Sequence, residues 1–206
     1  MFGLFKLFSK KKKDNIPSEM KYLVVGLGNI GDEYAQTRHN VGFEVLEAIA
    51  KNNEAQFKDE RYGAVTTYKF KSRQIVLLKP NTYVNLSGRA INYWMQKEKI
   101  PLSNVLVVVD DLALPFGSLR LKTKGGDAGH NGLKSIQSTL GTASYSRLRF
   151  GIGNKFSKGR QVDFVLGKWS DEEWSGLLER VKVVEDIVKA FVTIGAARTM
   201  SQYNNK

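Results

Sequence analysis

The chain has 206 residues, 42% hydrophobic and 25% charged, and a formal net charge of +12. This composition is typical of one globular domain with a substantial core. No apolar run approaches the about 20 residues that a helix needs to cross a bilayer, and the absence of cysteine excludes disulfides and thiolate chemistry. We therefore expect a cytoplasmic protein, and the basic charge favours a polyanionic partner, with nucleic acid ahead of a membrane surface.

Residues 1–20 are expected to form a flexible basic N-terminal extension. A short apolar start is followed by lysines at positions 10–13, and blocks of like charge are usually disordered. Regular hydrophobic patterns begin at Lys21. Residues 21–206 are therefore predicted to form the folded domain.

The first half of this domain predicts strands and helices in alternation. Residues 22–26 form a short apolar run bounded by glycine, which is typical of a buried strand. Asn40 precedes apolar residues at helical spacing, so we expect it to be the N-cap of a helix. Further predicted elements are strands at 64–70 and 74–78, joined by a short polar turn, and a helix at 86–97.

The second half continues the alternation. We predict strands at 105–109 and 147–152 and a helix at 132–140. Ser170 and Glu173 have the spacing of a capping box, which opens a long amphipathic helix. Together these elements predict a single three-layer α/β domain with a mixed, mostly parallel central sheet flanked by helices. The adjacent strands at 64–70 and 74–78 are the expected antiparallel exception.

The segment at residues 26–31 matches the G-x-G-x-x-G pattern of dinucleotide-binding sites. In such sites the helix begins at the last glycine, so that its N-terminus meets the pyrophosphate. Here residues 32–39 intervene, and Asp32 and Glu33 put two carboxylates where a phosphate would bind. We therefore expect no nicotinamide cofactor, and infer that the glycines let the backbone turn sharply and expose Asn29.

The chain contains two histidines, His39 and His130, and each is followed by asparagine. With no cysteine and no nucleophilic serine motif, histidine is the natural acid–base group near neutral pH. Both histidines lie where a helix is predicted to begin, and a helix N-terminus disfavours a protonated imidazole. Local electrostatics therefore does not distinguish the two. Either one suits the activation of water by a general base.

Other polar residues also lie at predicted strand ends or helix starts, where they can converge on one crevice. Asp110 ends a strand and could orient an imidazole or simply form a turn. Asn85 could belong to a site or cap the following helix. The glycine-rich loop at residues 124–132 lacks the G-K-[ST] ending, so it does not predict a P-loop.

Six motifs follow one another along the chain: VVGLGNIG (24–31), YAQTRHN (34–40), KPNTYVNLSG (79–88), DDLALPFG (110–117), GHNGLKSI (129–136) and RLRFGIG (147–153). In their order and spacing these motifs resemble those of bacterial-type peptidyl-tRNA hydrolases. The resemblance covers about residues 21–205, and a seventh segment, VDFVLGK at 162–168, extends it.

The resemblance implies a monomeric α/β enzyme that needs no metal or cofactor and cleaves the ester between peptide and tRNA in peptidyl-tRNA, so that the tRNA is reused in translation. By the family pattern His39 is the general base and Asp110 its orienting partner. Asn29 corresponds to the amide that positions the water or the ester. His130 falls beside the site in a structural role.

The resemblance also implies how the substrate is held. Tyr34, Asn85 and Asn131 match residues that hold or line the substrate crevice, and Lys122 and Arg149 match positions that contact RNA. Other cations that could hold phosphates are Arg120, Arg147, Lys155, Lys158 and Arg160. The chain departs from the usual family pattern at Ile30, Val84, Ala113 and Ala128. Of these, Val84 and Ala128 could reshape the peptide side of the crevice.

Two other functions stay open on the sequence. A non-catalytic RNA-binding protein is one, since plant organelles use relatives of this family as splicing cofactors, and it predicts tRNA binding without turnover. A nucleotide-cofactor enzyme is the other, and it predicts NAD binding.

Overall fold

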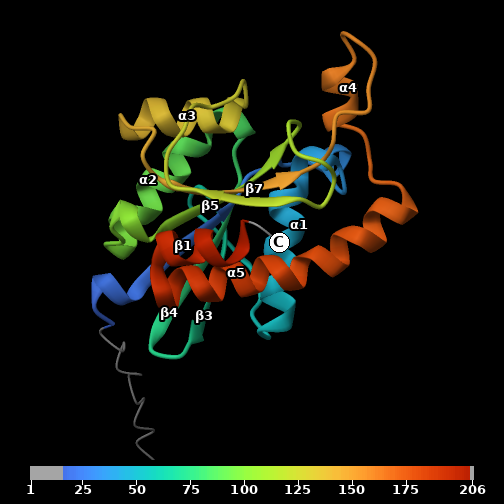
Figure 1. Cartoon of the computed structure of the whole chain (residues 1–206). Helices are drawn as coiled ribbons and strands as arrows, with labels where there is room; N and C mark the ends of the chain where they lie inside the picture. The colour runs from blue at the N-terminus through green and yellow to red at the C-terminus, as the bar shows by residue number, and fades with distance from the viewer. Residues whose placement is uncertain (1–15, 205–206) are drawn as a thin grey trace, which may run out of the picture.

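The computed structural model describes residues 16–204, and its centre is a seven-stranded mixed sheet with helices on both faces (Figure 1). This confirms the predicted α/β fold. Most of the extension predicted for residues 1–20 lies outside the described residues. No helix within residues 16–204 is long and apolar enough to cross a bilayer.

The sheet has the strand order β2-β3-β4-β1-β5-β7-β6. The strands are β1 (Lys21–Gly26), β2 (Lys58–Glu60), β3 (Gly63–Phe70), β4 (Arg73–Pro80), β5 (Val105–Asp111), β6 (Leu119–Lys122) and β7 (Ser146–Gly151). The four central strands β4, β1, β5 and β7 are parallel, whereas β2, β3 and β6 run antiparallel to their neighbours. The carboxyl ends of the four parallel strands therefore meet at one edge of the sheet.

Two pairs of helices cover the sheet. α1 (Val41–Asn52) and α5 (Asp171–Tyr203) pack on one face, and α2 (Ser87–Glu98) and α3 (Asn131–Leu140) on the other (Figure 1). Because both faces are covered, the apolar residues of β5 are buried at successive positions and not alternately. This explains why the strand at 105–109 could be predicted from a continuous apolar run.

Three short elements were not predicted: β2, β6 and α4 (Gln161–Val165). β2 and β6 add antiparallel pairs at the two edges, so the antiparallel part of the sheet is larger than expected. The capping box at Ser170 is confirmed. The long helix that it opens has a kink at Gly195, where φ is 78° and ψ is 166°.

Candidate active site

A cleft of about 770 Å³ lies at the carboxyl edge of the parallel strands. Its walls come from the end of β5, the strands β6 and β7, the loop before α3 and one side of α4. Residues named from the sequence that line it are Asn29, His39, Val84, Asp110, Ala113, Lys122, Ala128, His130, Asn131, Arg147 and Arg149. The fold thus gathers residues that are up to 120 positions apart in the chain, as the positions of Asn29 and Arg149 show.

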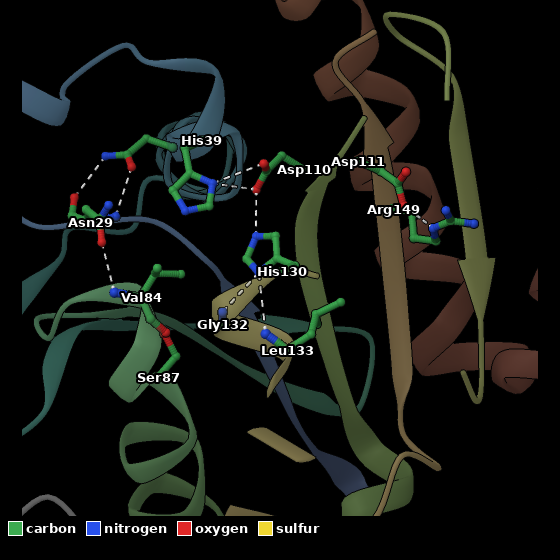
Figure 2. A network of polar contacts seen from close by, with 11 residues as sticks. Asn29, His39, Val84, Ser87, Asp110, Asp111, His130, Gly132, Leu133 and Arg149 are labelled. Atoms are coloured by element: carbon green, nitrogen blue, oxygen red, sulfur yellow. Dashed lines mark hydrogen bonds and ion pairs between the residues drawn. The ribbon is translucent and has the colours of Figure 1, made fainter. Parts of the chain in front are cut away.

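His39 and Asp110 form a hydrogen-bonded pair in this cleft (Figure 2). Nδ1 of His39 lies 3.1 and 3.0 Å from the two carboxylate oxygens of Asp110. Burial alone would raise the pKa of Asp110, but the two imidazoles that face it hold this pKa well below its ordinary value. Asp110 is therefore ionised, so His39 donates its Nδ1–H and leaves Nε2 as a lone-pair acceptor.

The pKa of His39 is raised above its ordinary value. Burial acts to lower this pKa, but the charge of Asp110 and its hydrogen bond together outweigh the burial. Asp110 thus stabilises the protonated imidazole, which is the form that a general base adopts after it has taken a proton.

His130 contacts the same carboxylate, which the sequence did not indicate. Its Nε2 lies 2.9 Å from Oδ1 of Asp110, and its Nδ1 accepts hydrogen bonds from the backbone N–H groups of Gly132 and Leu133 at 3.0 and 3.4 Å. His130 is therefore the N-cap of α3 as well as a neighbour of His39, and the two ring centroids are 5.0 Å apart. Figure 2 shows that both rings point a nitrogen at the carboxylate of Asp110.

Asn29 is held in place from three directions. Its Oδ1 accepts a hydrogen bond from the backbone N–H of Val84 at 2.9 Å, which leaves the side-chain NH₂ as a donor. Its backbone N–H and C=O bond to the Asn40 side chain, both at 2.9 Å. Within residues 16–204 the Asn29 NH₂ has no hydrogen-bond acceptor, and Asn29 lines the cleft.

Asn40 is the N-cap residue of α1, as predicted, but its side chain does not cap the helix. Its amide bonds to the Asn29 backbone instead. The residue after His39 thus fixes the turn that carries Asn29.

The glycines of the G-x-G-x-x-G segment pack the backbone instead of binding a pyrophosphate. A Cβ on Gly26 would lie 2.2 Å from the carbonyl oxygen of Gly42, and a Cβ on Gly42 would lie 2.5 Å from the backbone N and O of Leu27. These two glycines let the start of α1 touch the end of β1. The close approach places the turn that carries His39 beside Asn29 and Asp110.

The remaining predicted residues are more scattered. Val84 is buried in the cleft wall and Asn131 is exposed at its rim. Tyr34 is half-buried and Asn85 is exposed, and neither lines the cleft. Asn85 does not cap α2, because Leu86 is the N-cap residue.

The cations of β6 and β7 differ in what they can reach. Lys122 is exposed on the cleft wall, and Arg149 pairs through its Nε with Asp111. Arg147 is only 2% exposed, and its terminal nitrogens donate to the carbonyls of Gly126 and Ala143 at 3.0 and 2.8 Å. Arg147 therefore holds the glycine-rich loop and is not free to bind a phosphate, contrary to the prediction.

The donor atoms of His39, Asp110 and His130 lie within 4.8 Å of one another, which is a spacing that could hold a metal ion. However, both imidazoles are at hydrogen-bond distance from the carboxylate, so these donor atoms are already occupied by one another. We assign no metal to them.

Comparison with known proteins decides the family. The model of the peptidyl-tRNA hydrolase family matches residues 23–206. The chain belongs to the peptidyl-tRNA hydrolase family. The reaction that names this family is the hydrolysis of peptidyl-tRNA, and the cleft holds the His39 imidazole, the carboxylate that it contacts and a free amide donor.

Individual members of the family are similar over nearly their whole length. A peptidyl-tRNA hydrolase of Phocaeicola vulgatus is 63% identical over 91% of this chain and 100% of its own, and that of Porphyromonas gingivalis is 59% identical over 90% and 100%. The crystal structure of peptidyl-tRNA hydrolase from Acinetobacter baumannii superimposes with a TM-score of 0.83 at 36% identity, over 91% of this chain and 95% of that one. The resemblance seen in the six motifs is thus confirmed.

Proposed function

We propose that His39 is the general base with which this chain hydrolyses peptidyl-tRNA, that Asp110 orients it, and that Asn29 positions the water or the ester. The observation that supports this most directly is the pair of hydrogen bonds between Nδ1 of His39 and Asp110. They leave Nε2 of His39 free in the same cleft as the amide NH₂ of Asn29. The family assigns the reaction, and these contacts support the roles.

The reaction then runs in two proton transfers. Nε2 of His39 takes a proton from a water molecule as the water oxygen attacks the carbonyl carbon of the ester. The Asn29 NH₂ donates a hydrogen bond to the attacking water or to the developing oxyanion. When the tetrahedral intermediate collapses, the C–O bond to the ribose breaks, and the imidazolium returns its proton to the ribose oxygen. Asp110 remains ionised throughout and holds the ring in one tautomer.

Contacts around this centre support a division of the substrate. We assign Val84, Asn131, Asn85 and Tyr34 to the peptide and the terminal nucleoside, and Lys122 and Arg149 to tRNA phosphates. Val84 and Asn131 line the cleft next to Asn29 and His130, whereas Lys122 and Arg149 lie on its β6–β7 side. The cleft thus has an apolar, amide-rich side and a cationic side. This arrangement suits a substrate that consists of a peptide and a polyanionic tRNA.

The wider setting is also part of the proposal. We expect the chain to act as a cytoplasmic monomer and to need no cofactor. Residues 21–206 would form the hydrolase domain, and the basic N-terminal extension would add a weak attraction for RNA. The lysines at 10–13 are the basis for this last assignment.

The replacement His39→Ala tests the proposal. It should lower kcat for an N-blocked aminoacyl-tRNA about 10²–10⁴-fold without added metal, because general-base assistance is lost. Asn53→Ala is the control, since Asn53 bonds to Ile49 and Glu185 at the far end of α1. It should lower the unfolding temperature and leave kcat nearly unchanged. Full activity of a folded His39→Ala variant would overturn the role of His39.

A further inference from the structure

The hydrogen bonds of His130 determine which of its nitrogens carries the proton. Two backbone N–H groups, of Gly132 and Leu133, point at Nδ1, so Nδ1 must be an acceptor without a proton. The proton of the neutral ring is then on Nε2, which faces Oδ1 of Asp110 at 2.9 Å. His130 is therefore a fixed donor to Asp110, and α3 determines its tautomer.

Asp110 consequently divides its hydrogen bonding between two imidazoles. Its Oδ1 faces both Nδ1 of His39 and Nε2 of His130, whereas its Oδ2 faces His39 alone. The carboxylate side chain is 4% exposed, so water competes little for these oxygens. A change in one imidazole must therefore alter the hydrogen bond that the other one makes.

Several charged groups near His39 form their own pairs or bond to backbone, as the contacts Asp111–Arg149, Arg38–Glu173 and Glu44–Gln36 N–H show. Lys122 and Lys124 line the same cleft. Within residues 16–204, Asp110 is the one charged group that acts on the pKa of His39. A group that strengthens or weakens the interaction between Asp110 and His39 will therefore change the pKa of His39.

We propose that His130 is a positioning residue for the reaction, whose Nε2–H takes part of the hydrogen-bonding capacity of Asp110 and so limits how strongly Asp110 holds the protonated form of His39. This inference rests on the proposed role of His39 as the base. Its consequence is that His39 releases its proton to the leaving ribose oxygen more readily than it would beside an unshared carboxylate.

Two substitutions separate the donor role of His130 from its capping role. The side-chain oxygen of His130→Asn can take the place of Nδ1 and cap α3, but this side chain is too short to reach Asp110. The longer amide of His130→Gln can take the place of Nε2 and donate to Asp110, but it loses the cap. The first variant tests the proposal, and the second is its matched control.

The position of the acidic limb of kcat/KM distinguishes the two roles. In His130→Asn the Asp110 carboxylate accepts a hydrogen bond from His39 and none from residue 130. The midpoint of the acidic limb should therefore move to higher pH by about 0.5–1 unit. In His130→Gln the midpoint should stay near the wild-type value, while the unfolding temperature falls. A wild-type midpoint in His130→Asn, or the same upward shift in both variants, would overturn the proposal.

A spectroscopic measurement tests the geometry in the wild-type protein. The chain has two histidines, so the imidazole ¹⁵N spectrum of the labelled protein contains two rings, and His130→Gln assigns them. We expect neutral His130 to carry its proton on Nε2 and neutral His39 to carry it on Nδ1. A proton on Nδ1 of neutral His130 would overturn the proposal.

Failure of this inference can be told from failure of the proposed function. If His39→Ala remains fully active, the role of His39 is wrong and the inference falls with it. If His39→Ala is inactive but His130→Asn keeps the wild-type acidic limb, only the role of His130 is wrong.

Discussion

At the scale of single residues, the basicity of His39 depends on a buried carboxylate, Asp110, that also contacts His130. Asp110 is 7% exposed and accepts hydrogen bonds from both histidines. Because the pKa of His39 is raised, the base becomes protonated, and activity falls, at a higher pH than for an ordinary imidazole. The midpoint of the acidic limb in the pH profile should therefore lie above the pKa of an ordinary imidazole.

Asp110→Asn should change both the rate and this pH profile. The neutral amide removes the charge that stabilises the imidazolium and no longer selects the Nδ1–H tautomer, so kcat/KM should fall roughly 10²–10⁴-fold. The acidic limb should move to lower pH, because the cause of the raised pKa is gone. Steady-state kinetics between pH 5 and 8 measures both effects, and an unshifted limb would argue against Asp110 as the partner of the base.

Asn29→Asp tests the amide donor with little change of shape. The new carboxylate still accepts the Val84 N–H, but it offers no NH₂ to the reaction. Loss of one such donor should lower kcat about 10²–10³-fold while the unfolding temperature changes little. A variant with wild-type kcat would assign Asn29 to the backbone turn alone.

The sequence allowed some of these residues to be predicted and not others. His39, Asp110 and Asn29 were named because polar groups at strand ends converge, but local chemistry alone could not choose between His39 and His130. That choice depends on which ring nitrogen is free, and this follows from contacts across 71 positions for His39 and 20 for His130. Asn40 was correctly predicted as the N-cap residue of α1, but its side-chain contact with the Asn29 backbone, which lies outside that helix, was not predicted.

At the scale of elements, the site depends on how closely α1 approaches the sheet. Gly42 lies in the first turn of α1, directly after the segment that carries His39 and Asn40. Its missing side chain lets this turn contact Leu27 and the carbonyl oxygen of Val108. The position of His39 is thus determined by contact between backbones.

Gly42→Ala should therefore damage both stability and activity. The added Cβ would lie 2.5 Å from the backbone of Leu27, so α1 must shift, at a cost of about 1–3 kcal/mol in the free energy of unfolding. A displacement of His39 by about 1 Å could lower kcat about 100-fold. Lys51→Ala, an exposed change on the same helix, should affect neither quantity. Unchanged kinetics in Gly42→Ala would contradict this account of how α1 is positioned.

The longer elements could be predicted from the sequence, and the short ones could not. β1 and β5 are buried on both faces of the sheet and therefore appear in the sequence as continuous apolar runs. α5 has a long amphipathic pattern, and a capping box marks its first residue. β2 has three residues, all exposed, and β6 has four, so neither contains enough periods to be recognised. β6 is stabilised by contacts distant in sequence, since Asn204 bonds to the backbone N–H and C=O of Leu121 at 2.8 and 2.9 Å.

At the scale of the whole molecule, the net charge of +12 suits a polyanionic substrate. Part of this charge is committed to the fold, as buried Arg147 shows, and part faces the cleft, as exposed Lys122 shows. Net charge alone therefore overestimates the number of cations that can contact tRNA.

Lys122→Gln should weaken tRNA binding in a salt-dependent way. Removal of one phosphate contact should raise KM and reduce the slope of log KM against log salt concentration by about 0.7–0.9, with kcat nearly unchanged. Lys97→Gln is the control, because Lys97 pairs with Glu60 away from the cleft. Equal salt slopes in the wild type and Lys122→Gln would show that Lys122 does not contact a phosphate.

The measurement that tests the central claim most directly uses the whole chain with two substrates. An aminoacyl-tRNA with a blocked amine carries the amide of a peptide, whereas the form with a free amine does not. We expect the chain, without added metal, to release tRNA rapidly from the blocked form and much more slowly from the free-amine form. Binding of the blocked form without release of tRNA would contradict the account, because it would show a protein that binds RNA and does not hydrolyse it.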